Sequence, residues 1–100
     1  IGKSRNTNDA PTIGAGVALN NTTSTAIVTI TNRISMMIMT NDGNQDAWIK
    51  LQAASVDNDK KGFLLYKGTT TEIIFDHVVY IGEISGIADN GNTTIYTTTL

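Results

Sequence analysis

The chain has 100 residues, with nine acidic and seven basic side chains and a formal net charge of −2 at pH 7. A chain of this length forms one domain with one modest core, and so few charges give no electrostatic footprint for binding a nucleic acid. Because the chain has no cysteine, a disulfide framework, a zinc–thiolate site and a cysteine nucleophile are excluded within it.

Threonine, asparagine and serine supply most of the polar surface. Threonine favours strands and asparagine favours the turns between them. Lysine, which free-standing β-proteins use to blunt the edges of their sheets, is scarce. We interpret this composition as a β-protein that packs against neighbouring subunits, the alternative being an ordinary threonine-rich β-domain. No apolar run approaches the roughly 20 residues that span a bilayer, so we expect no membrane contact.

Residues 1–12 show no periodicity and carry two cations, Lys3 and Arg5. Pro11 has no backbone N–H to donate and therefore interrupts any regular central strand at this point. We expect an extended N-terminal arm over residues 1–12 and a single β-domain over residues 13–100. The arm is either held by a partner or, as in many isolated proteins, a terminus that nothing holds.

Eight short apolar runs, separated by turns rich in Gly, Asn or Asp, predict the strands of the domain. Turn signals about every eight to twelve residues, with no helical period, are typical of an all-β, antiparallel β-sandwich or small barrel of jelly-roll or immunoglobulin-like type. The runs are Ile13–Leu19, Ser24–Thr31, Arg33–Thr40, Ala47–Gln52, Phe63–Lys67, Thr71–Asp76, Val78–Ala88 and Thr93–Leu100.

The segment Arg33–Gly43 is the one around which we expect the fold to be organised. Asn41, Asp42 and Gly43 end its strand, because these residue types tolerate the positive φ of a tight reversal. A strand that is apolar on both sides lies in a core, or between a core and a partner surface. One side of this strand is firmly apolar and the other is rich in sulfur, formed by Ile34, Met36 and Ile38 and by Ser35, Met37 and Met39.

Three further patterns predict details of the sheets. We expect Ile27 and Ile30 on opposite faces of their strand, and we expect Asp89–Asn92 to form a hairpin between the last two strands. The run from 47 to 52 alternates with period two, with Ala47, Ile49 and Leu51 inward and Trp48, Lys50 and Gln52 outward. An outward indole either marks a contact surface or covers a sheet edge.

Candidate catalytic and metal-binding residues are few. His77 lies beside Asp76, but a hydrolytic site also needs a nucleophile and an oxyanion hole, and no Gly-x-Ser-x-Gly motif is present. The acidic turns Asp42–Asp46 and Asp57–Gly62 are similar to calcium loops. However, Ala53 and Gly68 stand where an EF-hand requires a bidentate Glu. We therefore expect no enzyme activity, cofactor or metal, with a weak calcium site on a β-loop as the open alternative.

Two features of the sequence concern the attachment and the binding of glycans. The three Asn-x-Thr sequons, at Asn20, Asn21 and Asn92, arise readily by chance in a chain so rich in Asn and Thr. A glycan-binding groove would need several exposed aromatic residues. The candidates are Trp48, Tyr66, Tyr80 and Tyr96, for which we favour use in an interface or in the core.

Four stretches together resemble small virion proteins of tailed bacteriophages. They are NRISMMIMTNDG at residues 32–43, WIKL at 48–51, GFLL at 62–65 and YIGEISGIADNG at 80–91. The likeness is a pattern of strands and turns over residues 32 to about 97, and it contains no active-site motif. Gly86 stands where alanine is commoner in such chains, and the acidic ending that they carry is absent here.

The resemblance implies a non-enzymatic structural protein of the virion, assembled in the host cytoplasm: a head decoration (cement) protein, or a small tail or adaptor subunit. Its partners would be the major capsid protein or other virion subunits, and further copies of itself in a homo-oligomer, with a trimer favoured. The rival function is that of a carbohydrate-binding β-sandwich module. The residues that we expect at the partner interface are Lys3, Arg5, Pro11, Trp48 and Tyr80.

Overall fold

The structure is a computed structural model that describes residues 11–55, 60–75 and 80–100, and these residues form strands and no helix. No described segment is therefore a helix that could cross a membrane. The strands are β1 (Thr12–Ile13), β2 (Val17–Leu19), β3 (Thr25–Ile30), β4 (Met36–Asn41), β5 (Ala47–Lys50), β6 (Phe63–Leu65), β7 (Thr70–Ile74), β8 (Gly82–Ala88) and β9 (Thr93–Thr99).

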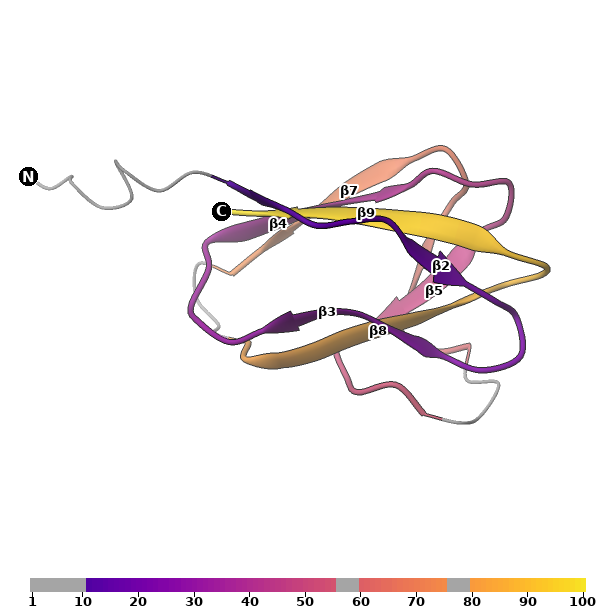
Figure 1. Cartoon of the computed structure of the whole chain (residues 1–100), viewed down its shortest axis with the longest axis horizontal. Helices are drawn as coiled ribbons and strands as arrows, with labels where there is room; N and C mark the ends of the chain where they lie inside the picture. The colour runs from indigo at the N-terminus through magenta and orange to yellow at the C-terminus, as the bar shows by residue number, and fades with distance from the viewer. Residues whose placement is uncertain (1–10, 56–59, 76–79) are drawn as a thin grey trace, which may run out of the picture.

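The strands form two antiparallel sheets that pack face to face, as the sequence predicts (Figure 1). Sheet A has the order β1-β9-β4-β7, and β2 also pairs with β9. Sheet B has the order β3-β8-β5-β6. The core lies between the two sheets and is filled mainly by isoleucine, leucine and methionine side chains. The predicted all-β sandwich is thus confirmed.

The sandwich is one long hairpin rolled into two layers. From the connection between β5 and β6 outward, β5 pairs with β6, β4 with β7, β3 with β8 and β2 with β9. Successive pairs alternate between sheet B and sheet A, which is the jelly-roll arrangement. Residues at similar distances from the connection are partners: Ala47 with Leu65, Ile38 with Glu72, Val28 with Ile84 and Val17 with Ile95.

This topology makes one sequence-based prediction wrong. Asp89–Asn92 does turn the chain, and Gly91 adopts a φ of +63° there. However, the turn carries the chain from β8 in sheet B to β9 in sheet A, so the two strands are not a hairpin. A turn signal specifies the local reversal of the backbone, whereas the strand's partner is decided by which faces must be buried.

A β-bulge in β3 overturns a second prediction. The register between β3 and β8 shifts between Ala26 and Val28, so the extra residue, Ile27, has no partner across the ladder. The bulge resets the alternation of side chains, and Ile27 and Ile30 are consequently both buried in the core instead of lying on opposite faces.

The strand around which the fold was expected to be organised is central in sheet A, between β9 and β7. It begins at Met36, three residues later than predicted. Its sulfur-rich side faces the core, where Met37 and Met39 are fully buried. The opposite side, with Met36 and Ile38, is half-buried on the outside of sheet A.

In β5 the predicted alternation is correct for Ala47 and Ile49, which are fully buried, and it then fails. Leu51 was expected inward but is 38% exposed, because the strand ends at Lys50 and the chain leaves the sheet. Lys50 lies on the outer side as predicted, opposite Ser85, but it is only 7% exposed. The outer side of sheet B is therefore covered near this residue.

The N-terminal run predicted over 13–19 is two short strands, because Gly14–Gly16 separates β1 from β2. Thr12, placed in the arm by the sequence, pairs with Thr99 of β9. Residues 1–10 lie outside the described structure, as do the start of the run predicted from Val78 and the pair Asp76–His77.

Asn41, at the end of β4, joins the two sheets through a buried polar network. Its side-chain amide donates to the carbonyl oxygen of Leu65 in sheet B at 3.0 Å and to that of Gln45 at 2.8 Å. The hydroxyl of Thr93 donates to its side-chain oxygen at 2.5 Å. Asn41 has no exposed surface, so each of these partners would lose a hydrogen bond with no water to replace it.

We predict that Asn41→Ala lowers the free energy of unfolding by about 3 kcal/mol, because it leaves buried groups of three segments without partners. Urea denaturation measures the loss. Asn44→Ala, at an exposed position in the same turn, is the matched control and should change stability by less than about 0.5 kcal/mol. Equal effects of the two substitutions would contradict the role assigned to Asn41.

Gly62 fixes the backbone where the chain returns to sheet B. Its φ is +94°, and a Cβ at this position would lie 1.9 Å from the carbonyl oxygen of Ile49. Gly68 also has a positive φ, +72°, but a Cβ there would meet no atom within 4 Å. Substitution of Gly68 therefore introduces backbone strain alone, whereas substitution of Gly62 adds a steric clash with Ile49.

Gly68→Ala should cost about 1 kcal/mol from the backbone conformation alone. Gly62→Ala should cost at least about 3 kcal/mol, which for a domain of this size lowers the Tm by more than about 10 °C. Thermal melts of the two variants measure the difference. A Tm for Gly62→Ala equal to that of Gly68→Ala would show that the close approach to Ile49 relaxes freely.

Candidate interaction surface

The outer face of sheet A is rich in aliphatic and threonine side chains. Alternation along β4, β7 and β9 places every second residue on this face, opposite the core. Among the outward positions of the described strands of sheet A, Glu72 is the one that carries a charge. The large apolar side chains that are exposed on this face are Ile13 (76%), Ile74 (53%), Leu100 (45%) and Tyr96 (42%).

The register shows how these side chains lie beside one another. Ile38 of β4 lies between Thr98 of β9 and Glu72 of β7, and Ile13 of β1 lies on the far side of Thr98. The next row toward the C-terminal end of β9 contains Leu100, Met36 and Ile74, with backbone hydrogen bonds joining Leu100 to Met36. The row on the other side contains Tyr96, Thr40 and Thr70, and the two threonine hydroxyls are hydrogen-bonded at 2.9 Å.

The outer face of sheet B, in contrast, is partly covered by residues 52–55 of the connection between β5 and β6. The Ser85 hydroxyl donates to the carbonyl oxygen of Gln52 at 2.7 Å, and the backbone N–H of Ala54 donates to the Glu83 carboxylate at 2.6 Å. Ser24, just before β3, exchanges two hydrogen bonds with the backbone of Ser55. The polar groups of this face are thus satisfied within the chain.

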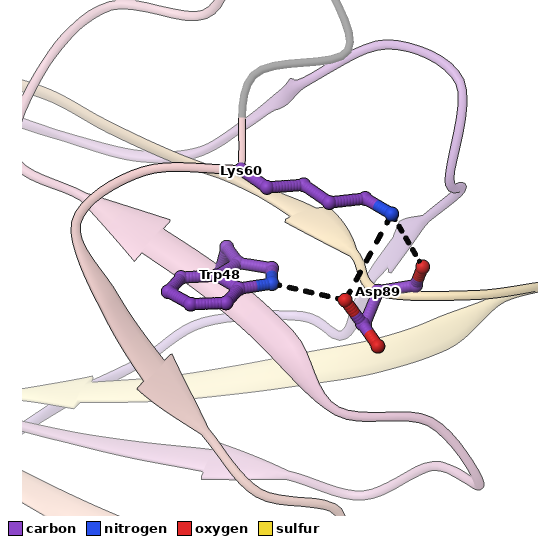
Figure 2. A network of polar contacts seen from close by, with 3 residues as sticks. All are labelled: Trp48, Lys60 and Asp89. Carbon is purple, nitrogen blue, oxygen red and sulfur yellow. Dashed lines mark hydrogen bonds and ion pairs between the residues drawn. The ribbon is translucent and has the colours of Figure 1, made fainter.

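Trp48 lies on this covered side of sheet B, beside Ile87 in the register. Its indole N–H donates to the Asp89 carboxylate at 3.1 Å, and the Lys60 ammonium donates to the Asp89 carbonyl oxygen at 2.8 Å (Figure 2). Lys60 and Asp89 also form an ion pair of 3.8 Å. The indole is therefore half-buried in a polar network, and since β5 lies between β8 and β6, it does not cover a sheet edge.

Of the other residues expected at a partner interface, Pro11 and Tyr80 lie within the described structure, in different places. Pro11 is exposed just before β1. Tyr80 is half-buried against the core, and its hydroxyl donates to the carbonyl oxygen of Glu83. Lys3 and Arg5 lie outside the described residues. The structure therefore does not gather these residues in one place. The aliphatic face of sheet A was not among them, although the outward residues of the run from 33 to 40 were a signal for it.

The acidic turns have structural partners where they are described. The Asp46 carboxylate accepts the backbone N–H of Lys67 at 2.9 Å, and Asp42 is exposed. Asp57 and Asp59 lie outside the described ranges. Within those ranges, no three His, Cys, Asp or Glu side chains come together as a metal site would require.

The aromatic side chains do not form a common groove. Trp48 is on the outer side of sheet B, Tyr96 is on the outer side of sheet A, and Tyr66 is exposed after β6. Neither Trp48 nor a tyrosine lines the shallow hollows beside β5, β3 and β7. The aromatic cluster that a glycan-binding groove would need is thus not found among the described residues.

Comparison with known proteins finds no family model that matches the chain and no curated protein that is similar to it.

Trp48 is the sole tryptophan of the chain, so its fluorescence reports on the network around Asp89. We predict that Asp89→Ala shifts the emission of Trp48 to longer wavelength and makes it easier to quench with acrylamide. Stability should fall by no more than about 1 kcal/mol, because the broken contacts are near the surface. Asn90→Ala, one residue along the same turn, should leave the spectrum unchanged. An unaltered spectrum for Asp89→Ala would show that Asp89 does not hold the indole.

Proposed function

We propose that this protein is a non-enzymatic structural subunit of a phage virion, and that it decorates the capsid by packing the outer face of sheet A against neighbouring subunits. The single observation that carries the proposal is the contrast between the two sheets. The chain partly covers the outer face of sheet B with its own connection, and it leaves a nearly uncharged, aliphatic face on sheet A. An exposed apolar face of this kind marks a site of protein contact.

The size of the face fits a subunit that acts in many copies. Four strands spaced by about 4.8 Å, each with about six residues on a rise of about 3.4 Å, span roughly 400 Å². A stable pairwise interface uses about 800 Å² on each partner. One face therefore binds weakly by itself, and binding becomes strong when linked copies engage a repeating surface together.

Two further arguments support a virion role over carbohydrate binding. Jelly rolls occur both in viral capsid proteins and in lectins, so the fold alone does not choose between them. The resemblance of residues 32 to about 97 to phage virion proteins favours the first. No grouping of the described aromatic residues favours the second.

We predict that Ile38→Glu and Ile13→Glu each reduce binding to undecorated capsids of the encoding phage by at least tenfold, because each buries an unpaired charge in the contact. Co-sedimentation with capsids measures binding. Thr29→Glu, at an exposed position of β3 in sheet B, is the matched control and should bind like the unaltered protein.

Loss of binding in all three variants, or in none, would contradict the assignment of the contact to sheet A. If the unaltered protein ignored capsids altogether, the decoration function itself would be wrong, and a glycan array would be the next assay. Deletion of residues 2–11 separately tests the predicted arm, including Lys3 and Arg5, and should also weaken binding.

A further inference from the structure

The described strands leave four sheet edges, and three of them are blunted. The edge formed by β1 and β2 is interrupted at Gly14–Gly16. The β3 edge contains the bulge at Ala26–Val28, and the β6 edge is only three residues long. Interruption, bulging and shortness are the ways in which proteins prevent a sheet edge from pairing with another chain.

The fourth edge, β7, has none of these protections. It pairs with β4 without a register shift over five residues, Thr70–Ile74. Its sequence, TTEII, contains no proline and no lysine, which are the residues that most often guard an exposed edge. Among the described strands, β7 is therefore the edge at which another strand can be added.

The backbone groups that β7 offers can be assigned from its pairing with β4. Phe75 donates its N–H to Ser35, and Thr69 accepts from the N–H of Asn41, so the odd-numbered residues point toward β4. In an antiparallel strand the even-numbered residues then point the other way. The N–H and C=O groups of Thr70, Glu72 and Ile74 consequently face the free edge, and all three residues are exposed.

We propose that β7 pairs with β7 of a second copy of this chain, antiparallel about a two-fold axis at Ile73. Since the other three described edges are blunted, the edge that best fits β7 in a solution of this protein is another β7. Two-fold pairing at Ile73 places Glu72 opposite Ile74 of the partner copy. Pairing centred on Glu72 would instead set two carboxylates directly opposite each other, which is destabilising.

The pairing also covers apolar surface beside the edge. An open hollow of about 500 Å³ lies between β7 and β6, and its apolar lining is Leu51, Phe63, Ile73 and Ile74. The second copy brings the same residues to the same axis, and the outer faces of the two sheets A become one continuous face. This inference does not rest on the proposed capsid function, and it predicts a dimer where the resemblance to phage proteins implies a trimer.

Disulfide trapping tests the register, because the chain has no cysteine of its own. At Ile73 the two Cα atoms would face each other across a pair without hydrogen bonds, about 4.5 Å apart, within the range of about 4.4–6.8 Å that a disulfide bridges. At Glu72 the two copies are offset by two residues, about 7–8 Å apart. Under mild oxidation, I73C should form a covalent dimer at least tenfold faster than E72C. Equal rates, or faster trapping of E72C, would overturn the proposed register.

Sedimentation equilibrium tests whether the β7 edge makes the dimer, and it uses substitutions at the exposed Glu72 instead of the half-buried Ile73. Glu72→Pro removes an N–H that faces the free edge, which an edge strand tolerates, and Glu72→Thr removes the same charge but keeps the N–H. We expect a concentration-dependent dimer for the unaltered protein and for Glu72→Thr, and a Kd at least tenfold weaker for Glu72→Pro with an unchanged circular dichroism spectrum.

As a second blocking variant, Ile74→Glu should also weaken the dimer, because it sets a second carboxylate opposite Glu72 of the partner copy, whereas Ile13→Glu on the opposite edge should not. A monomer or a trimer of the unaltered protein, or equal dissociation constants for Glu72→Pro and Glu72→Thr, would overturn the proposal. Neither result would decide whether the protein binds capsids, because the co-sedimentation assay tests that function separately.

Discussion

The buried amide of Asn41 is the interaction on which the two-layer arrangement depends. A rolled hairpin must pass repeatedly from one sheet to the other, and at each crossing the backbone leaves its hydrogen-bonding ladder. Asn41 stands at the crossing from β4 to β5 and bonds to a crossing residue, to sheet B and to β9. An apolar residue could fill its volume but could not satisfy these groups. The side chain thus ties the end of β4 to β9 in its own sheet and to β6 in the other sheet.

The same winding explains why the two outer faces differ. The centre of the rolled hairpin is the connection between β5 and β6, whose residues 52–55 bond to Glu83 and Ser85 of sheet B and to Ser24 just before β3. Among the described residues no such connection covers sheet A, whose outward residues are mainly aliphatic or threonine, with Tyr96 and Glu72 among them. Hydrogen bonds within the chain satisfy polar groups of one face, while the other face has large apolar side chains exposed.

Much of the fold could be predicted from the sequence, because the strands follow period-two patterns and turn residues, which are local signals. The positions of the strands, the all-β sandwich and the burial of Ala47 and Ile49 are correct for this reason. Strand partners could not be predicted, since pairing joins residues far apart in the chain. The bulge at Ile27 and the sheet-crossing turn at Asp89–Asn92 are errors of this kind.

The candidate site could be predicted less well than the fold. Trp48 and Tyr80 were selected as aromatic residues on strands, but their hydrogen bonds to Asp89 and Glu83 come from tertiary structure. The outer face of sheet A combines residues of several strands and becomes visible only once the register is known. Gly86 has a structural reason of the same type: a Cβ would lie 3.0 Å from the carbonyl oxygen of Trp48.

The central claim is that the outer face of sheet A is the surface by which this protein assembles. Under the proposed decoration function, electron cryomicroscopy of undecorated phage capsids incubated with the purified protein tests it most directly. The account predicts ordered density in which sheet A lies against neighbouring subunits and the connection between β5 and β6 faces solvent. Density with sheet B against the shell, or capsids that stay bare, would contradict it.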